Sequence, residues 1–178
     1  VNYIAWDTKK VTNFEQMFLA ATEFNKSIQN WNTISGSDFD RMFQNADAFT
    51  QSLATQSVSI NGENWYSWDV SNSTSDNISS HGAILNGMVS YMSLYKGEGL
   101  SSWNVESASF NSSFAQSSNL TNNYNDILIS WAAQNPTYTG SIGFGSSKYD
   151  GSIGSAASAS RSQLETVNGW VITDGGPV

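Results

Sequence analysis

Trp6 and Trp31 begin two copies of one sequence unit, 25 residues apart. Aromatic, aliphatic and small residues return in the second copy at the positions they hold in the first, and so many agreements in a single register are not expected by chance. Equivalent residues in such a chain need equivalent surroundings, so each unit is predicted to pack against the next. The matched pairs are Phe14 with Phe39, Met17 with Met42, Phe18 with Phe43, Ala21 with Ala46, Phe24 with Phe49, and Ile28 with Leu53.

Two later tryptophans, Trp68 and Trp103, begin further copies that keep the order of the parts but lengthen the spacing. The excess residues fall in two places, near 54–64 and near 71–85. We interpret both as loop insertions that emerge together on one face, because insertions into stacked repeats map to loops.

This period predicts an α/β solenoid, a leucine-rich-repeat-like right-handed coil of about four to five repeats, each with a short strand and a helix. The helix is predicted at Phe14, Met17 and Phe18, whose three- and four-residue spacing lays one apolar stripe inward. The strands are expected near 3–8, 28–33, 65–70 and 100–105. The repeat tryptophans recur in the same register and are expected in the core: Trp6, Trp31, Trp68 and Trp103.

Residues 1–123 are assigned to the repeats, and residues 124–178 to a C-terminal cap and linker. Helices are predicted over Tyr124–Ala133 and Ala156–Val167, and a last strand over Trp170–Thr173. We expect these elements to close the array, because an open end would expose core and an unpaired strand edge.

The run Ile4–Phe18, with Ala21 and Phe24–Asn25 after it, closely resembles the repeat of BspA-like bacterial surface proteins, a leucine-rich-repeat subtype. The first copy departs from that repeat mainly by Phe14 in place of Met, and the chain from residue 124 onward is similar to the terminal unit of such arrays. The resemblance implies an exported surface or secreted protein used in adhesion and in host or cell contact. Similar units occur inside giant calcium-dependent adhesins of the RTX type. The resemblance implies no catalytic residue.

The charge balance and the lack of cysteine narrow the function further. Fifteen acidic side chains against seven basic ones leave a formal net charge of -8, which would repel a phosphate backbone, so no nucleic-acid partner is expected. Without Cys there is no thiolate metal site and no thiol nucleophile. No apolar run approaches the roughly 20 residues of a membrane span, so no membrane insertion is expected. We interpret the chain as an extracellular segment, at the bacterial cell surface, of a longer protein.

The residue after each repeat tryptophan carries a side-chain oxygen that can accept a hydrogen bond. We favour a structural role for these residues, because Asx side chains satisfy backbone groups at bends. A metal role is the alternative. Calcium is possible but unsupported, since the Asp-x-Asp-x-Asp-Gly spacing of calcium loops is missing, and no cofactor is predicted. This Asx ladder consists of Asp7, Asn32, Asp69 and Asn104.

Aromatic residues beside the insertions are the best candidates for ligand contact. Tyr66 and Tyr91 are favoured, with Trp65 and Tyr95 as further candidates, because flat rings stack on sugars and anchor protein interfaces at low entropy cost. Against this, the repeat phase makes Trp65 and Tyr95 core positions. His81, the single histidine, stands in no catalytic or metal-binding pattern.

The sequence therefore predicts a non-catalytic domain of a bacterial cell-surface adhesin that binds a protein or glycan on another cell surface. The alternative is a structural spacer or a homodimerisation module of a large adhesin, because the edge at Val1–Trp6 shows no cap unless upstream residues supply one. A polysaccharide-active enzyme has the least support, because the acidic residues show no spacing typical of a catalytic acid and base.

Overall fold

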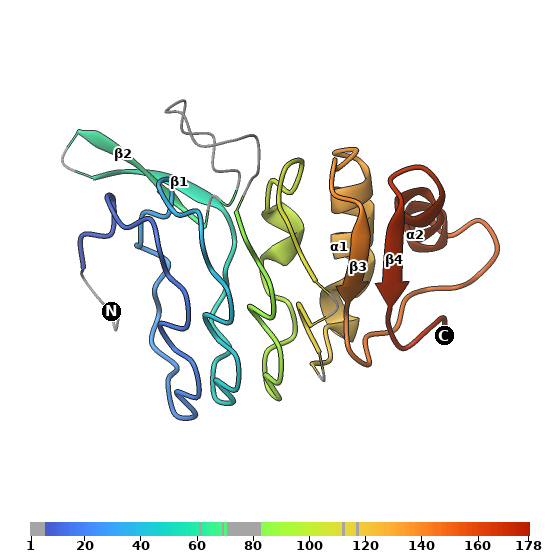
Figure 1. The fold of residues 1–178 in the computed structure, drawn as a ribbon, viewed down its shortest axis with the longest axis horizontal. Helices are drawn as coiled ribbons and strands as arrows, with labels where there is room; N and C mark the ends of the chain where they lie inside the picture. Colours follow the sequence, from blue (N-terminus) through green and yellow to red (C-terminus); the bar gives the residue numbers. More distant parts are fainter. Residues whose placement is uncertain (1–5, 61, 69, 71–82, 112, 117) are drawn as a thin grey trace.

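The computed structural model describes residues 6–60, 62–68, 70, 83–111, 113–116 and 118–178. In chain order the elements are β1 (Gln56–Ile60), β2 (Glu63–Ser67), the 3-10 helix η1 (Leu100–Ser102), α1 (Thr121–Ala132), β3 (Gly140–Gly143), α2 (Ala156–Thr166) and β4 (Trp170–Thr173). β1 and β2 pair antiparallel, and β3 and β4 pair parallel. The chain advances along the long axis from the first repeat at one end to α2 and β4 at the other (Figure 1).

The predicted α/β solenoid is wrong. The described residues contain two α-helices, both after residue 120, and two separate two-stranded sheets, so neither a helix nor a continuous sheet recurs through the repeats. Of the predicted strands, 28–33 forms none, 65–70 overlaps only the antiparallel strand β2, and 100–105 begins with η1. The range 3–8 lies partly outside the described residues.

Backbone hydrogen bonds explain why no helix forms where the apolar spacing predicted one. Residues 14–21, the first turn segment, fold as consecutive turns, in which the N–H of Met17 donates to the C=O of Phe14 at 3.2 Å. The intervening N–H groups donate instead to residues 38–44 of the next repeat, as from Phe14 to the C=O of Asp38 at 2.7 Å. An α-helix would use nearly all of these N–H groups within itself, so the bonds between repeats would be lost.

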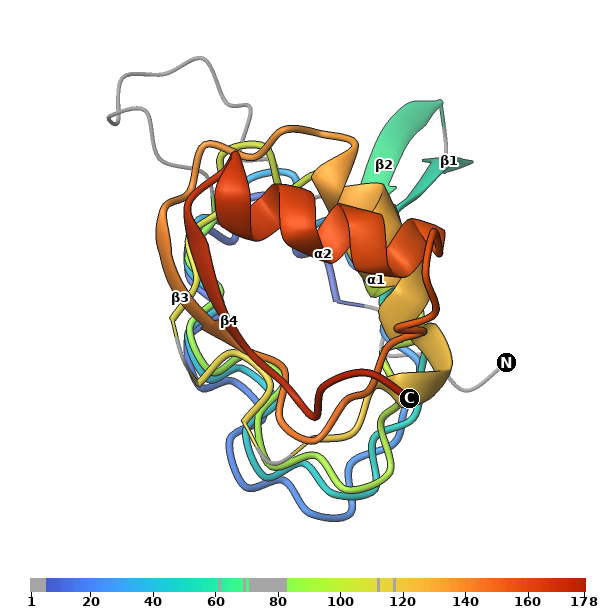
Figure 2. The same ribbon diagram turned by 90° about the vertical axis from the view of Figure 1, so that its right-hand side faces the viewer.

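Two further turn segments, residues 39–46 and 85–92, continue the same arrangement. Each donates alternate N–H groups to the repeat that follows, as from Phe43 to the C=O of Met88 at 3.0 Å. Viewed along the long axis, the successive repeats superpose (Figure 2). Isolated parallel bridges mark their register at Asn13 with Asp38, Asp38 with Ile84, and Ile84 with Ser109.

The register passes across the predicted insertions, because Asp38 pairs with Ile84. The first insertion, 54–64, overlaps the β1–β2 hairpin, which projects out of the stacked repeats (Figure 1). Most of the second, 71–85, lies outside the described residues.

The turn segments need left-handed backbone at two positions in each repeat. This conformation costs a residue other than glycine about 1–2 kcal/mol, so the hydrogen bonds between repeats must offset it. The residues concerned are Gln16 and Ala20 (φ 56° each), Arg41 (51°) and Asn45 (60°), and Gly87 (60°) and Tyr91 (55°).

Aromatic rings stack from one repeat to the next along the core. The ring centroids of Phe14 and Phe39 are 5.0 Å apart, and those of Phe18 and Phe43 are 5.4 Å apart. Such offset stacks add to the free energy gained by burying the rings. The aromatic matches of the sequence repeat are therefore contacts between neighbouring repeats.

The first repeat tryptophan departs from its predicted place in the core. Trp31, Trp68 and Trp103 are fully buried, but Trp6 is 58% exposed. One face of its ring stacks on Trp31, with centroids 5.6 Å apart. Trp6 belongs to the outermost described repeat, and among the described residues its ring stacks on Trp31 alone.

The predicted secondary structure near the C-terminus is confirmed. α1 begins at Thr121, three residues before the predicted start, α2 covers nearly all of its predicted range, and β4 has the predicted bounds. Ser155 caps α2, because its hydroxyl accepts the N–H of Ser158 at 3.1 Å.

A buried ion pair joins α1, α2 and the end of β4. Arg161 Nε donates to the Asp174 carboxylate at 2.9 Å, and the Tyr124 hydroxyl donates to the same oxygen at 2.7 Å. The Asp174 side chain is 3% exposed, so its charge depends on these donors. Burial, reinforced by the charge and hydrogen bond of Asp174, raises the pKa of Tyr124 well above its ordinary value.

We predict that Ala20→Gly raises the free energy of unfolding by about 0.5 kcal/mol, because relief of left-handed strain exceeds the added chain entropy. Ala159→Gly, at an exposed position inside α2, is the matched control and should lower it by about 1 kcal/mol. Urea unfolding measures both. A loss at Ala20 equal to that at Ala159 would show that residues 14–21 are helical.

The raised pKa of Tyr124 predicts alkaline unfolding. Unfolded tyrosine releases its proton near pH 10 while folded Tyr124 keeps it, so this stabilisation is full below about pH 10 and is lost as the pH rises further. Tyr124→Phe should flatten the loss above about pH 10, yet lower stability near pH 7 by about 1–3 kcal/mol, because Asp174 loses a donor. Urea unfolding across this pH range checks both effects, and an unchanged alkaline slope would contradict the assignment.

Candidate interaction surface

The β1–β2 hairpin is held firmly at its base and projects from the stacked repeats (Figure 1). The N–H of Thr33 donates to the C=O of Tyr66 at 2.9 Å, and the Ser67 hydroxyl donates to the C=O of Gln29. Just before β1, the Thr55 hydroxyl donates to the C=O of Trp68, which follows β2, at 2.8 Å. The hairpin is thus fixed to the body while its tip extends outward.

One face of the hairpin combines an aromatic ring with small polar side chains. Ser57 pairs with Tyr66 and Ser59 with Asn64, and because strand side chains alternate, these four share a face. All four are exposed, and Tyr66 is 36% accessible to solvent. Trp65 points to the opposite face and is half-buried. A flat ring beside hydroxyl and amide groups suits contact with a sugar or a protein.

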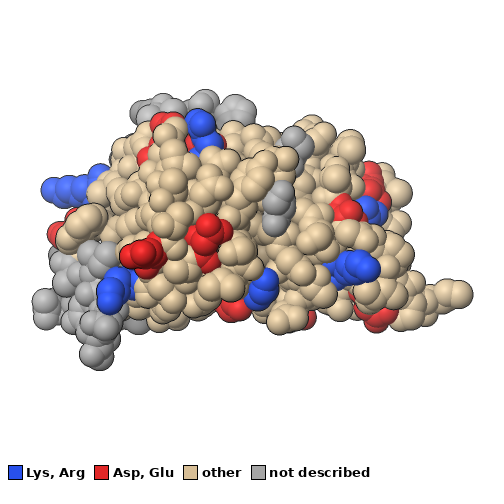
Figure 3. Space-filling view, turned by 90° about the horizontal axis from the view of Figure 1, so that it is seen from below, with Lys and Arg blue, Asp and Glu red and all other residues tan. Residues whose placement is uncertain are grey.

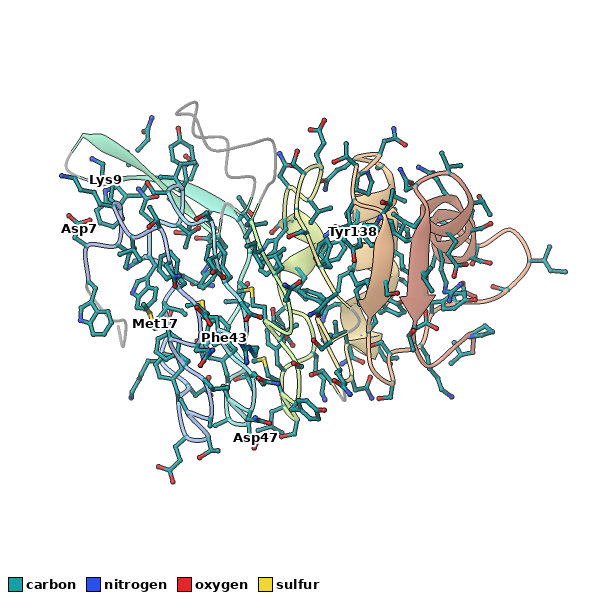
Figure 4. All side chains as sticks on the ribbon, viewed as in Figure 1. Asp7, Lys9, Met17, Phe43, Asp47 and Tyr138 are labelled. Carbon is teal, nitrogen blue, oxygen red and sulfur yellow. The ribbon has the colours of Figure 1, made fainter. Side chains whose placement is uncertain are left out.

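The second favoured residue, Tyr91, lies elsewhere. It is 38% exposed and stands in the third turn segment, two residues before Ser93, whose hydroxyl donates to the Asp47 carboxylate at 3.1 Å. Asp47 lies at the lower end of the molecule in Figure 4, on the side opposite the hairpin. Tyr66 and Tyr91 therefore do not share one surface.

The fourth candidate, Tyr95, is fully buried. Its hydroxyl donates to the C=O of Glu98 at 2.8 Å, and burial raises its pKa well above the ordinary value. The ring packs against Phe49, with centroids 6.0 Å apart. Tyr95 therefore lies in the core and presents no surface to a ligand.

The oxygens of the Asx ladder turn back onto their own backbone. Asp7 Oδ1 accepts the N–H two residues later at 3.1 Å, Asn32 Oδ1 does so at 3.2 Å, and Asn104 Oδ1 at 3.1 Å. This is the geometry of Asx turns. The fourth member, Asp69, lies outside the described residues, as does His81. Within the described part of the chain, no group of three or more His, Cys, Asp or Glu side chains could hold a metal ion.

Charged side chains are sparse on the surface. Seen from below, the acidic and basic groups form separate spots on a mostly neutral face (Figure 3). Of the helices that the structure describes, none has the length and apolar character needed to cross a bilayer.

A second exposed surface lies at the N-terminal end, and the sequence predicts only part of it. Trp6, Met17 and Leu19 of the first repeat are all exposed, and Met17 lies at this end of the molecule (Figure 4). The sequence predicts an uncapped edge at Val1–Trp6, of which residues 1–5 lie outside the described part of the chain. The apolar stripe through Met17 predicts burial instead, because its spacing is that of an amphipathic helix.

Comparison with protein families gives one match, which covers less than half of the chain. Residues 2–81 match the family described as "Mycoplasma protein of unknown function, DUF285". The finer resemblance to BspA-like repeats stays a prediction. Comparison with curated proteins and with solved structures gives no significant match.

The placement of the tyrosines predicts opposite effects on stability. Tyr66→Ala should change the free energy of unfolding by less than about 0.5 kcal/mol, because the ring is exposed on the hairpin. Tyr95→Ala should lower it by about 3–5 kcal/mol, because a buried ring leaves a cavity. Urea unfolding of both variants tests the prediction, and a comparable loss in Tyr66→Ala would mean that the hairpin packs into the core.

Proposed function

We propose that this chain is a non-catalytic module of a bacterial cell-surface protein, which binds a protein or glycan on another cell surface. The observation that carries the proposal is the exposed Tyr66 ring on a hairpin whose base is fixed by hydrogen bonds. The match of residues 2–81 to a family of Mycoplasma proteins supports a bacterial origin. An extracellular location agrees with the lack of cysteine and with the surface-protein resemblance of the repeats.

The hairpin suits a contact role for physical reasons. Tyr66 has few rotatable bonds, and its strand is ordered before any ligand arrives, so binding costs little conformational entropy. The exposed groups of Ser57 and Asn64 on the same face can donate to or accept from a polar ligand.

We expect the purified chain to bind members of a glycan array or purified host surface proteins, and Tyr66→Ala to weaken that binding about tenfold or more, since a stacked ring contributes about 1–1.5 kcal/mol. Surface plasmon resonance gives the affinities. Tyr91→Ala is the matched control, because Tyr91 is equally exposed but stands in the third turn segment and not on the hairpin, and it should bind like the parent chain.

Each other result has a definite meaning. Loss of binding only in Tyr91→Ala would move the contact surface to the third turn segment. Binding that neither substitution changes would exclude the hairpin. A chain that binds nothing on either panel would favour the second candidate, a structural spacer, which is supported by the one-directional advance of the repeats along the long axis (Figure 1).

A further inference from the structure

The outer edge of β1 carries backbone groups that no described residue uses. The C=O of Tyr66 accepts the N–H of Thr33 at 2.9 Å, so the backbone groups of Tyr66 point away from β1. Directly opposed residues of an antiparallel pair direct their N–H and C=O groups either toward each other or both away. Ser57, opposite Tyr66, and Ser59, two residues later, therefore direct theirs to the outer edge. There they meet no other backbone group of the described chain.

This edge lacks the features that keep strand edges from pairing with one another. Edges are usually blunted by a charged side chain, a proline or a bulge. β1 has none of these, because its five residues are uncharged and pair with β2 in an unbroken register from Gln56 to Ile60. Gln56, Ser57 and Ser59 are exposed. The hairpin also projects beyond the outline of the stacked repeats (Figure 2), so the edge is accessible to a further strand.

The edge is complementary to a second copy of itself. A twofold axis at Val58 sets Ser57 of one copy opposite the partner's Ser59, and Ser59 opposite the partner's Ser57. Each of these two pairs exchanges two N–H to C=O bonds, so four backbone bonds form and every outward group of Ser57 and Ser59 is used. The opposed side chains are serine hydroxyls, which can hydrogen-bond to each other.

Charge favours this edge as the contact between two copies. The net charge of -8 makes two copies repel each other over most of their surfaces. A twofold axis also sets residues near it against their own equivalents, so a charged residue there would meet a like charge. β1 carries no charge, and its Ser-Val-Ser order is the same in either direction. It offers no charge that would select an unrelated strand, whereas its symmetry suits its own copy.

We propose that two copies of this chain associate through the outer edges of their β1 strands, with Ser57 opposite the partner's Ser59, and form one four-stranded antiparallel sheet. Opposed residues lie on the same side of a sheet, so the two faces that carry Tyr66 join into one. The pairing uses the edge and leaves this face open, so the inference goes beyond the proposed ligand binding. Two paired five-residue strands form a contact smaller than the roughly 1,200 Å² of a standard interface, so we expect a dissociation constant on the order of 100 µM.

Sedimentation velocity of the intact chain, over concentrations that span the expected dissociation constant, should show a monomer that converts to a dimer. Ser59→Pro removes one outward N–H from each copy and with it two of the four bonds, so it should weaken the dimer at least tenfold. Asn64→Pro is the matched control. Asn64 lies opposite Ser59, and its N–H points to the other edge of the hairpin, so proline there should leave the dimer unchanged. Thermal unfolding of both variants verifies folding.

Cysteine cross-linking tests the register. The chain contains no cysteine, so a single substitution gives each copy one thiol. Position 58 pairs with itself across the proposed axis in a non-hydrogen-bonded pair, where Cα atoms are about 4.5 Å apart and a disulfide can form. With copper phenanthroline as the oxidant, Val58→Cys should therefore form a covalent dimer at least tenfold faster than Asn64→Cys, whose thiol lies on the outer strand of the joined sheet.

Three results would overturn the inference: a monomer at every concentration, equal dimer affinities of Ser59→Pro and Asn64→Pro, or equal cross-linking rates of the two cysteine variants. Tyr66→Ala changes the face and not the edge, so it should still form the dimer. Absence of the dimer with intact Tyr66-dependent ligand binding would reject this inference alone. A dimer that binds no ligand would reject the proposed function alone.

Discussion

The division of backbone N–H groups between two kinds of partner is the constraint on which the stacked repeats depend. In each turn segment, one N–H closes a turn within the segment and the next donates to the following repeat, as those of Met17 and Phe18 do. Neither set alone could satisfy the backbone, because a buried N–H without an acceptor is costly. The left-handed residues follow from the same division, since a reversal of φ at Gln16 and Ala20 directs alternate groups outward.

This arrangement also accounts for the core. Repeats joined by a ladder of hydrogen bonds hold equivalent side chains in register, so Phe14 meets Phe39 and Phe18 meets Phe43. A stretch inserted between two ladders does not disturb either, as the pairing of Asp38 with Ile84 shows. Insertions are therefore free to acquire their own structure, and the β1–β2 hairpin is one such case.

The ladder also restricts where recognition can occur. It buries three of the four repeat tryptophans and turns the described Asx side chains toward the backbone, so these groups serve the fold. Side chains that could contact a ligand are therefore exposed where the stacking of repeats is interrupted or ends. The hairpin presents Tyr66 at an interruption, and the N-terminal face presents Trp6 and Met17 at an end. At the C-terminal end α2 packs against β4, and Arg161 pairs with the buried Asp174.

The sequence by itself determined the repeat, its register, the residues that meet across it and the C-terminal helices. These follow from local periodicity and from apolar identity, both of which are written in the chain. It could not determine that Phe14, Met17 and Phe18 belong to consecutive turns, because a helix and a series of turns give the same three- and four-residue spacing. Only the tertiary structure decided between them, since the acceptors that draw alternate N–H groups outward lie on the next repeat, 24 residues or more along the chain. The exposure of Trp6 and the separation of Tyr66 from Tyr91 were likewise decided by which neighbours each repeat has in space.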